Sequence, residues 1–187
     1  MTLLLLGLVI FFAAHIFATM RDARANLIAK IGEKPYKGLY SIVALIALIL
    51  IIIGWGARPF IPVWDPPVWT RHLAAFLMIP AMILLASSFL PSGRIAAAAK
   101  HPMLAAVKIW AFAHLLANGD LASLLLFGAF LAFAVYDRIQ IKTREGVSLP
   151  QPGPMTNDAL AVAGGLVFYA AFVLALHPLL IGVPVFL

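Results

Sequence analysis

Long apolar segments alternate with short polar ones along the whole chain. Apolar runs of roughly 20 residues are the length at which a helix crosses the hydrocarbon core of a bilayer. A backbone in lipid must close its hydrogen bonds internally, and long all-apolar runs do not suit the alternating strands of a barrel. The pattern predicts an all-α, polytopic transmembrane bundle of about six spans, at Thr2–Met20, Leu39–Ala57, His72–Leu90, Met103–Asn118, Leu121–Asp137 and Ala159–Gly182.

The segments between the predicted spans carry turn signals. Arg58–Thr70 contains four prolines and two tryptophans, so we expect a non-helical outer loop with its tryptophans at headgroup depth. In the Asn-Gly-Asp turn at 118–120, Gly119 is expected to leave the helix in a left-handed conformation and Asp120 to cap the next helix. The inner loop at 21–37 is expected to be partly helical, and the polar loop at 146–157 to be mobile.

The composition leaves too few polar residues for a separate soluble domain. Of the 187 residues, 64% are hydrophobic and 11% are charged, and we expect residues 1–187 to form a single transmembrane domain. Residues 1–20 have no basic segment before the apolar run, which predicts a retained first span and not a cleaved signal peptide. The absence of cysteine excludes disulfides, thiolate metal sites and thiol nucleophiles.

The net charge of +6 is distributed as a membrane topology requires. With the N-terminus outside, only Arg58 and Arg71 lie in outer loops, and Lys108 lies within a span. Such a positive-inside bias predicts a multi-pass membrane protein with both termini outside, which in a bacterium would be the periplasm. Its expected partner is the lipid bilayer and not nucleic acid. The inner loops hold ten of the thirteen cationic residues, Arg21, Arg24, Lys30, Lys34, Lys37, Arg94, Lys100, Arg138, Lys142 and Arg144.

Two histidines, His15 and His114, fall deep within predicted spans. An ionisable side chain at that depth is costly and therefore marks a functional candidate. A plain structural explanation is a neutral imidazole bonded to a backbone carbonyl or to the other histidine. The alternative is a shared metal, for which haem iron is the leading candidate. His15 has small neighbours that let another backbone or a flat ring approach.

The residues around His114 suggest further contacts for such a group. Asn118 lies on the same helical face as His114. Lys108 either snorkels to the inner surface or pairs with a buried anion such as a haem propionate. His101 lies about 20 Å before His114 along the helix, so both cannot bind one metal. His72 and His177 fall near outer helix ends, which leaves His15 as the remaining deep candidate.

The depths of the two deep histidines differ. Counted from Arg21 and Lys100, His15 is about 9 Å and His114 about 20 Å from the inner edge. A shared iron therefore requires tilted helices, or a fourth span that starts below the membrane plane.

Several motifs combine into a specific pattern. They are His15 with Arg21, His101-Pro102-Met103, Trp110, Ala113-His114-Leu115, Asn118-Gly119-Asp120-Leu121-Ala122-Ser123, Phe127-Gly128 and Tyr136-Asp137-Arg138. Through them the chain resembles, over essentially its whole length, the NnrU family of bacterial membrane proteins. The resemblance implies a role in denitrification, with redox or denitrification proteins as expected partners.

A more distant resemblance is to plastid 15-cis-zeta-carotene isomerase, a membrane protein that binds haem b. The histidines thought to hold its haem match His15 and His114. The chain departs from it at Ile16-Phe17, where the isomerase has Ser-Gly, which puts a carotenoid substrate in doubt more than the haem. Cations near the inner border would pair with the propionates, namely Arg21, Arg94, Lys100, Lys108 and Arg138.

The sequence therefore favours a haem b protein of nitrogen-oxide metabolism that acts as a redox partner, sensor or assembly factor. A haem-dependent cis–trans isomerase of a lipid-soluble polyene is the main alternative. A relative of the isoprenylcysteine carboxyl methyltransferases fits less well, because Lys100-His101-Pro102 matches their motif only in part. A non-catalytic structural subunit is the fourth interpretation.

Overall fold

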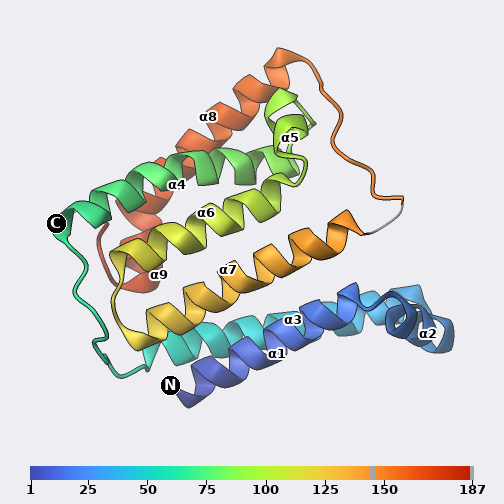
Figure 1. Ribbon diagram of the computed structural model, residues 1–187, viewed down its shortest axis with the longest axis horizontal. Coiled ribbons are helices and arrows are strands. Elements are labelled where there is room, and N and C mark those ends of the chain that lie inside the picture. The colour runs from blue at the N-terminus through green and yellow to red at the C-terminus, as the bar shows by residue number, and fades with distance from the viewer. Residues whose placement is uncertain (144–145, 186–187) are drawn as a thin grey trace. The chain divides into compact units, whose positions relative to one another are not determined.

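The computed structural model describes residues 1–143 and 146–185 (Figure 1). Arg144, counted above among the inner cations, lies outside the described residues. Within them, every regular element is a helix, and the all-α prediction is confirmed. The elements are α1 (Thr2–Thr19), α2 (Arg21–Ile31), α3 (Glu33–Gly56), α4 (Val68–Phe89), α5 (Arg94–Ala99), α6 (Pro102–Ala117), α7 (Leu121–Lys142), α8 (Met155–Ala171), the π-helix η1 (Phe172–Leu176) and α9 (His177–Ile181).

The described helices account for all six predicted spans. Five stretches are long and apolar enough to cross a membrane: α1, α3, α4, α7 and the continuous run Met155–Ile181. The fourth predicted span, α6, is also apolar but has only 16 residues. The chain is therefore built as a polytopic membrane protein.

Several predicted boundaries were wrong by a turn or more. The second span begins at Glu33 and not at Leu39, because the proline at 35 falls in the first turn, where its missing N–H has no helical partner. Trp69 lies in α4 and not in the preceding loop. The fifth span continues to Lys142, and α5 was not predicted at all.

The chain divides into two compact units, Met1–Ile61 and Pro62–Leu187. In the first, α1 packs along α3, and α2 contacts both. Two glycines allow the α1–α3 contact, because a side chain at Gly7 would overlap the backbone of Ile51 and one at Gly54 would overlap Leu4. Leu4 is fully buried at this crossing.

In the second unit, α4 lies between α6 and α8, and α6 also pairs with α7. Figure 1 shows α6 and α7 as two neighbouring helices joined by a short turn, as the sequence predicted. The contact between α4 and α8 is close because Gly165 faces the backbone of Ile83. The last span is interrupted by η1, which directly precedes His177.

A set of hydrogen bonds joins the turn after α4 to the segment before α8. Ser92 Oγ donates to the Gln151 carbonyl at 2.6 Å, and Asn157 Nδ2 donates to the Ser92 carbonyl at 2.8 Å. The Asp158 carboxylate accepts from the backbone N–H groups of Arg94 and Ile95 and thereby caps α5. The loop predicted at 146–157 therefore ends earlier, at the start of α8, and is tethered at Gln151.

We predict that Gly54→Ala destabilises the first unit. Its added methyl group would overlap Leu4, so we expect the free energy of unfolding to fall by about 1–3 kcal/mol. Gly38→Ala in the same helix is the matched control, since nothing lies within 4 Å of its added Cβ. Thermal unfolding in detergent compares the two, and equal midpoints would contradict the proposed crossing.

Candidate functional site

His15 lies in the last turns of α1 and is held by its own helix. Its Nδ1 is 2.7 Å from the Phe11 carbonyl, and its ring stacks on Phe11 with centroids 4.0 Å apart. Because a carbonyl only accepts, Nδ1 carries the proton. The ring of Tyr40 in α3 lies 5.5 Å away, between centroids. The imidazole thus has an aromatic ring from each of the two spans of its unit.

His114 has the same local arrangement in the second unit. Its Nδ1 is 2.8 Å from the carbonyl of Trp110, again four residues earlier. Its ring stacks on Phe127 of α7 with centroids 4.6 Å apart and planes 30° apart. The Trp110 ring lies 5.4 Å from it and also contacts Phe127 edge-on. The α6–α7 hairpin therefore orients this imidazole.

The shared arrangement has one chemical consequence. An imidazole that donates through Nδ1 carries, in its neutral form, its lone pair on Nε2, and that lone pair is the atom through which histidine binds a metal. A hydrogen bond from the other nitrogen to a carbonyl is the usual way to orient such a ligand. In both rings, Nδ1 makes the hydrogen bond to a backbone carbonyl that the structural explanation requires. A metal would therefore bind at Nε2.

The turn after His114 fixes the end of α6. Asn118 Nδ2 donates to the His114 carbonyl at 2.8 Å. The Gly119 carbonyl accepts from the N–H groups of Val63 and Trp64, at 2.8 and 3.1 Å. The prediction of a left-handed Gly119 was wrong, since its φ is not positive. Glycine is required there because a side chain would overlap the Trp64 carbonyl.

Asp120 starts α7, as the sequence predicted. Its carboxylate accepts from the Ser123 N–H at 3.1 Å and from the Ser123 hydroxyl. Asp120 is 4% exposed and Ser123 is fully buried, so this cap is shielded from solvent. Phe127, two turns after Asp120 in α7, stacks on His114.

The family model described as NnrU protein matches residues 3–185. The chain belongs to the NnrU family. Comparison with curated proteins and with solved structures finds no match. Family membership covers both units and all the helices described above.

Within this NnrU-family chain, the predicted site residues divide between the two units. His15 and Arg21 lie in the first, and His114, Lys108 and Asn118 lie in the second. Asn118 binds the backbone of His114, whereas Arg21 is an exposed residue at the start of α2 and Lys108 is half-buried within α6. The placement of one haem between His15 and His114 stays a prediction.

The donor chemistry limits what these residues can bind. Among the described residues, no group of three or more His, Cys, Asp or Glu is placed to hold a metal ion. A porphyrin supplies four of the iron ligands itself, so two imidazoles complete its axial positions.

His101 and His177 lie at helix ends. His101 precedes the first residue of α6, and partial burial together with the charge of Arg138 lowers its pKa. The imidazole of His101 therefore stays neutral to lower pH than usual. His177 Nδ1 donates to the Val183 carbonyl at 2.6 Å and closes the end of α9.

Two aromatic contacts of the site were missed from the sequence. Phe11 lies four residues before His15, so helical spacing could have revealed its stacking. Phe127 belongs to a neighbouring helix, and no spacing rule pairs it with His114. Its position follows only from the geometry of the turn at 118–120.

We predict that Asp120→Ala loosens the hairpin that orients His114. Loss of a helix N-cap costs about 1–2 kcal/mol, and the buried Ser123 hydroxyl also loses its acceptor. Asp65→Ala, at an exposed position in the neighbouring segment, removes the same charge and serves as the control. Chemical unfolding in detergent measures both variants, and an unchanged Asp120→Ala variant would rule out a stabilising cap.

Proposed function

We propose that this NnrU-family protein binds haem b in the bacterial inner membrane, with His15 and His114 as axial ligands, and acts in nitrogen-oxide metabolism. The observation that carries the proposal is the matched geometry of the two imidazoles. Each donates through Nδ1 to the carbonyl four residues earlier, and each stacks on a phenylalanine. The neutral rings of both spans therefore have the same tautomer, with the lone pair on Nε2.

The residues of the chain fit this group in several ways. The carbonyls of Phe11 and Trp110 set the tautomer and the angle of each ring. Phe11 and Phe127 cover one face of each imidazole and keep it from turning. Bound haem with two imidazole ligands supplies one-electron redox chemistry. Lys108 and Arg21 are the cations we assign to its carboxylates.

The proposal places a requirement on the helices. His15 lies four residues before the end of α1, about 6 Å by helical rise, and that end is the predicted inner one. His114 lies twelve residues after the start of α6, about 18 Å from the predicted inner end. Shared ligation therefore needs an offset or tilt that brings these depths together.

Absorption spectra of the purified protein test the haem assignment. We expect a Soret band in the wild type, and a haem content about tenfold lower or less in His15→Ala and in His114→Ala, because each loses an axial ligand. His72→Ala is the control, since it removes an imidazole that the proposal does not use. A pyridine haemochrome assay measures the haem bound per protein.

Three outcomes of that experiment separate the alternatives. Full haem content in both ligand variants would disprove the assignment. Loss in only one variant would mean that the two histidines do not share an iron. A wild-type spectrum typical of five-coordinate iron would favour the isomerase, which needs an open coordination position.

Complementation tests the metabolic role. In a denitrifying bacterium lacking its own NnrU-family protein, we expect the wild-type chain to restore anaerobic growth on nitrite. His114→Ala is expected not to restore it, whereas His72→Ala is. Equal growth with the empty vector and the wild type would remove denitrification from the proposal.

A further inference from the structure

Basic residues gather where α2 meets the start of α3. Arg21, Arg24, Lys30 and Lys34 are all exposed there. Lys37 is paired with Glu33 at 2.7 Å, so its charge is already matched. Only Asp22 opposes the other four along this segment. The first unit thus carries a net positive surface next to two apolar, membrane-length helices.

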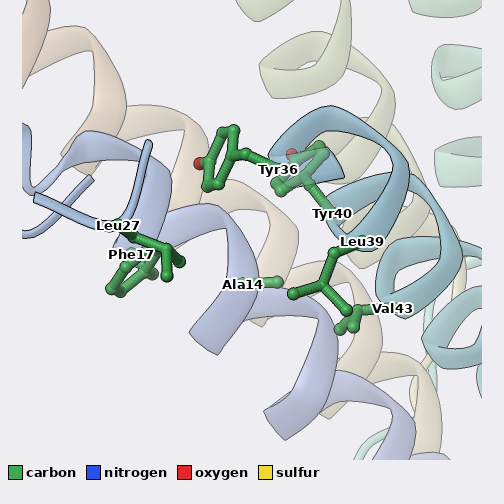
Figure 2. Close-up of a pocket in the computed structure, with 7 residues that line it drawn as sticks. All are labelled: Ala14, Phe17, Leu27, Tyr36, Leu39, Tyr40 and Val43. Carbon is green, nitrogen blue, oxygen red and sulfur yellow. The ribbon is translucent and has the colours of Figure 1, made fainter. Parts of the chain in front are cut away.

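The same unit contains a pocket of about 130 Å³ (Figure 2). All three helices of the unit contribute to it, through Ala14 and Phe17 of α1, Leu27 of α2 and four residues of α3 that include Tyr36 and Leu39. Its accessible wall is almost entirely apolar. Leu39 is 50% exposed, so the pocket is a groove at the surface and not a closed cavity.

The cations and the groove meet at one side chain. Tyr36 lines the groove, and the guanidinium carbon of Arg24 lies 5.7 Å from the centre of its ring. Arg24 is therefore held at the edge of the groove by a cation–π contact. Figure 2 shows Leu27 and Phe17 together at one end of the groove, with Leu39 and Val43 at the other.

We propose that this groove binds an anionic phospholipid, with one acyl chain against the apolar wall and the phosphate at Arg24. An apolar groove next to a cluster of cations has the chemistry of an amphiphile with a negative head. Clusters of four or more Lys or Arg beside a membrane helix are typical of acidic-lipid recognition. Because the wall is apolar, a soluble anion would use only the cations, and a neutral lipid only the groove.

The experiment titrates lipid into delipidated full-length protein and follows binding by native mass spectrometry. We expect wild-type protein to bind phosphatidylglycerol more tightly than phosphatidylcholine. Arg24→Gln should weaken phosphatidylglycerol binding about fivefold, the effect of one cation near a membrane surface, and weaken phosphatidylcholine binding less, because choline offsets the charge of its phosphate. Lys142→Gln, an exposed cation at the end of α7, is the matched control.

A second variant tests the groove itself. Ala14→Leu fills the groove and should weaken the binding of both lipids. If Ala14→Leu does not fold, Leu27→Ser is the variant used instead. Equal binding of the two lipids by the wild type, or an unchanged preference in Arg24→Gln, would overturn the proposal. Competition by inorganic phosphate alone would assign the cations to a soluble anion. His15→Ala should keep the lipid preference, so this experiment tests the lipid site independently of the haem proposal.

Discussion

Close contact between helix backbones is the constraint on which the rest of this structure depends. Lipid chains are as apolar as the side chains that face them, so burial of apolar surface does little to hold spans together. Contact at short range has to replace it, and glycine allows that contact at the crossings through Gly7, Gly54 and Gly165. Gly7 and Gly54 set α1 against α3, and this pairing forms both the surroundings of His15 and the groove next to Arg24.

The predictable part of the fold is the part controlled by membrane thickness. Hydropathy located a helix at each of the six predicted spans, five of which have the apolar length that a membrane crossing requires. It failed where short-range chemistry sets the boundary. Charged Glu33 hides the true start of α3, and α5 depends on a cap from Asp158, more than sixty residues away in sequence. No local pattern contains such a partner.

The candidate site shows the same division. Depth in a predicted span singled out His15 and His114, and a bond from each ring to a backbone carbonyl was one of the explanations considered. The structure gives that bond, to the carbonyls of Phe11 and Trp110, each four residues earlier in the same helix. The stacking of Phe127 on His114 was not foreseeable, because it depends on how tightly the chain reverses between α6 and α7. Gly119 was recognised as important for the wrong reason. Its role is to admit the neighbouring Trp64 backbone, which is distant in sequence.

The close approach of the Trp64 backbone joins the segment before α4 to the turn between α6 and α7. The Trp64 N–H donates to the Gly119 carbonyl, and the side chain of the adjoining Asn118 donates to the carbonyl of His114. Prolines on both sides of Trp64 restrict the backbone of this segment. The end of α6, which carries His114, is thereby tied to a segment that precedes α4 in the chain.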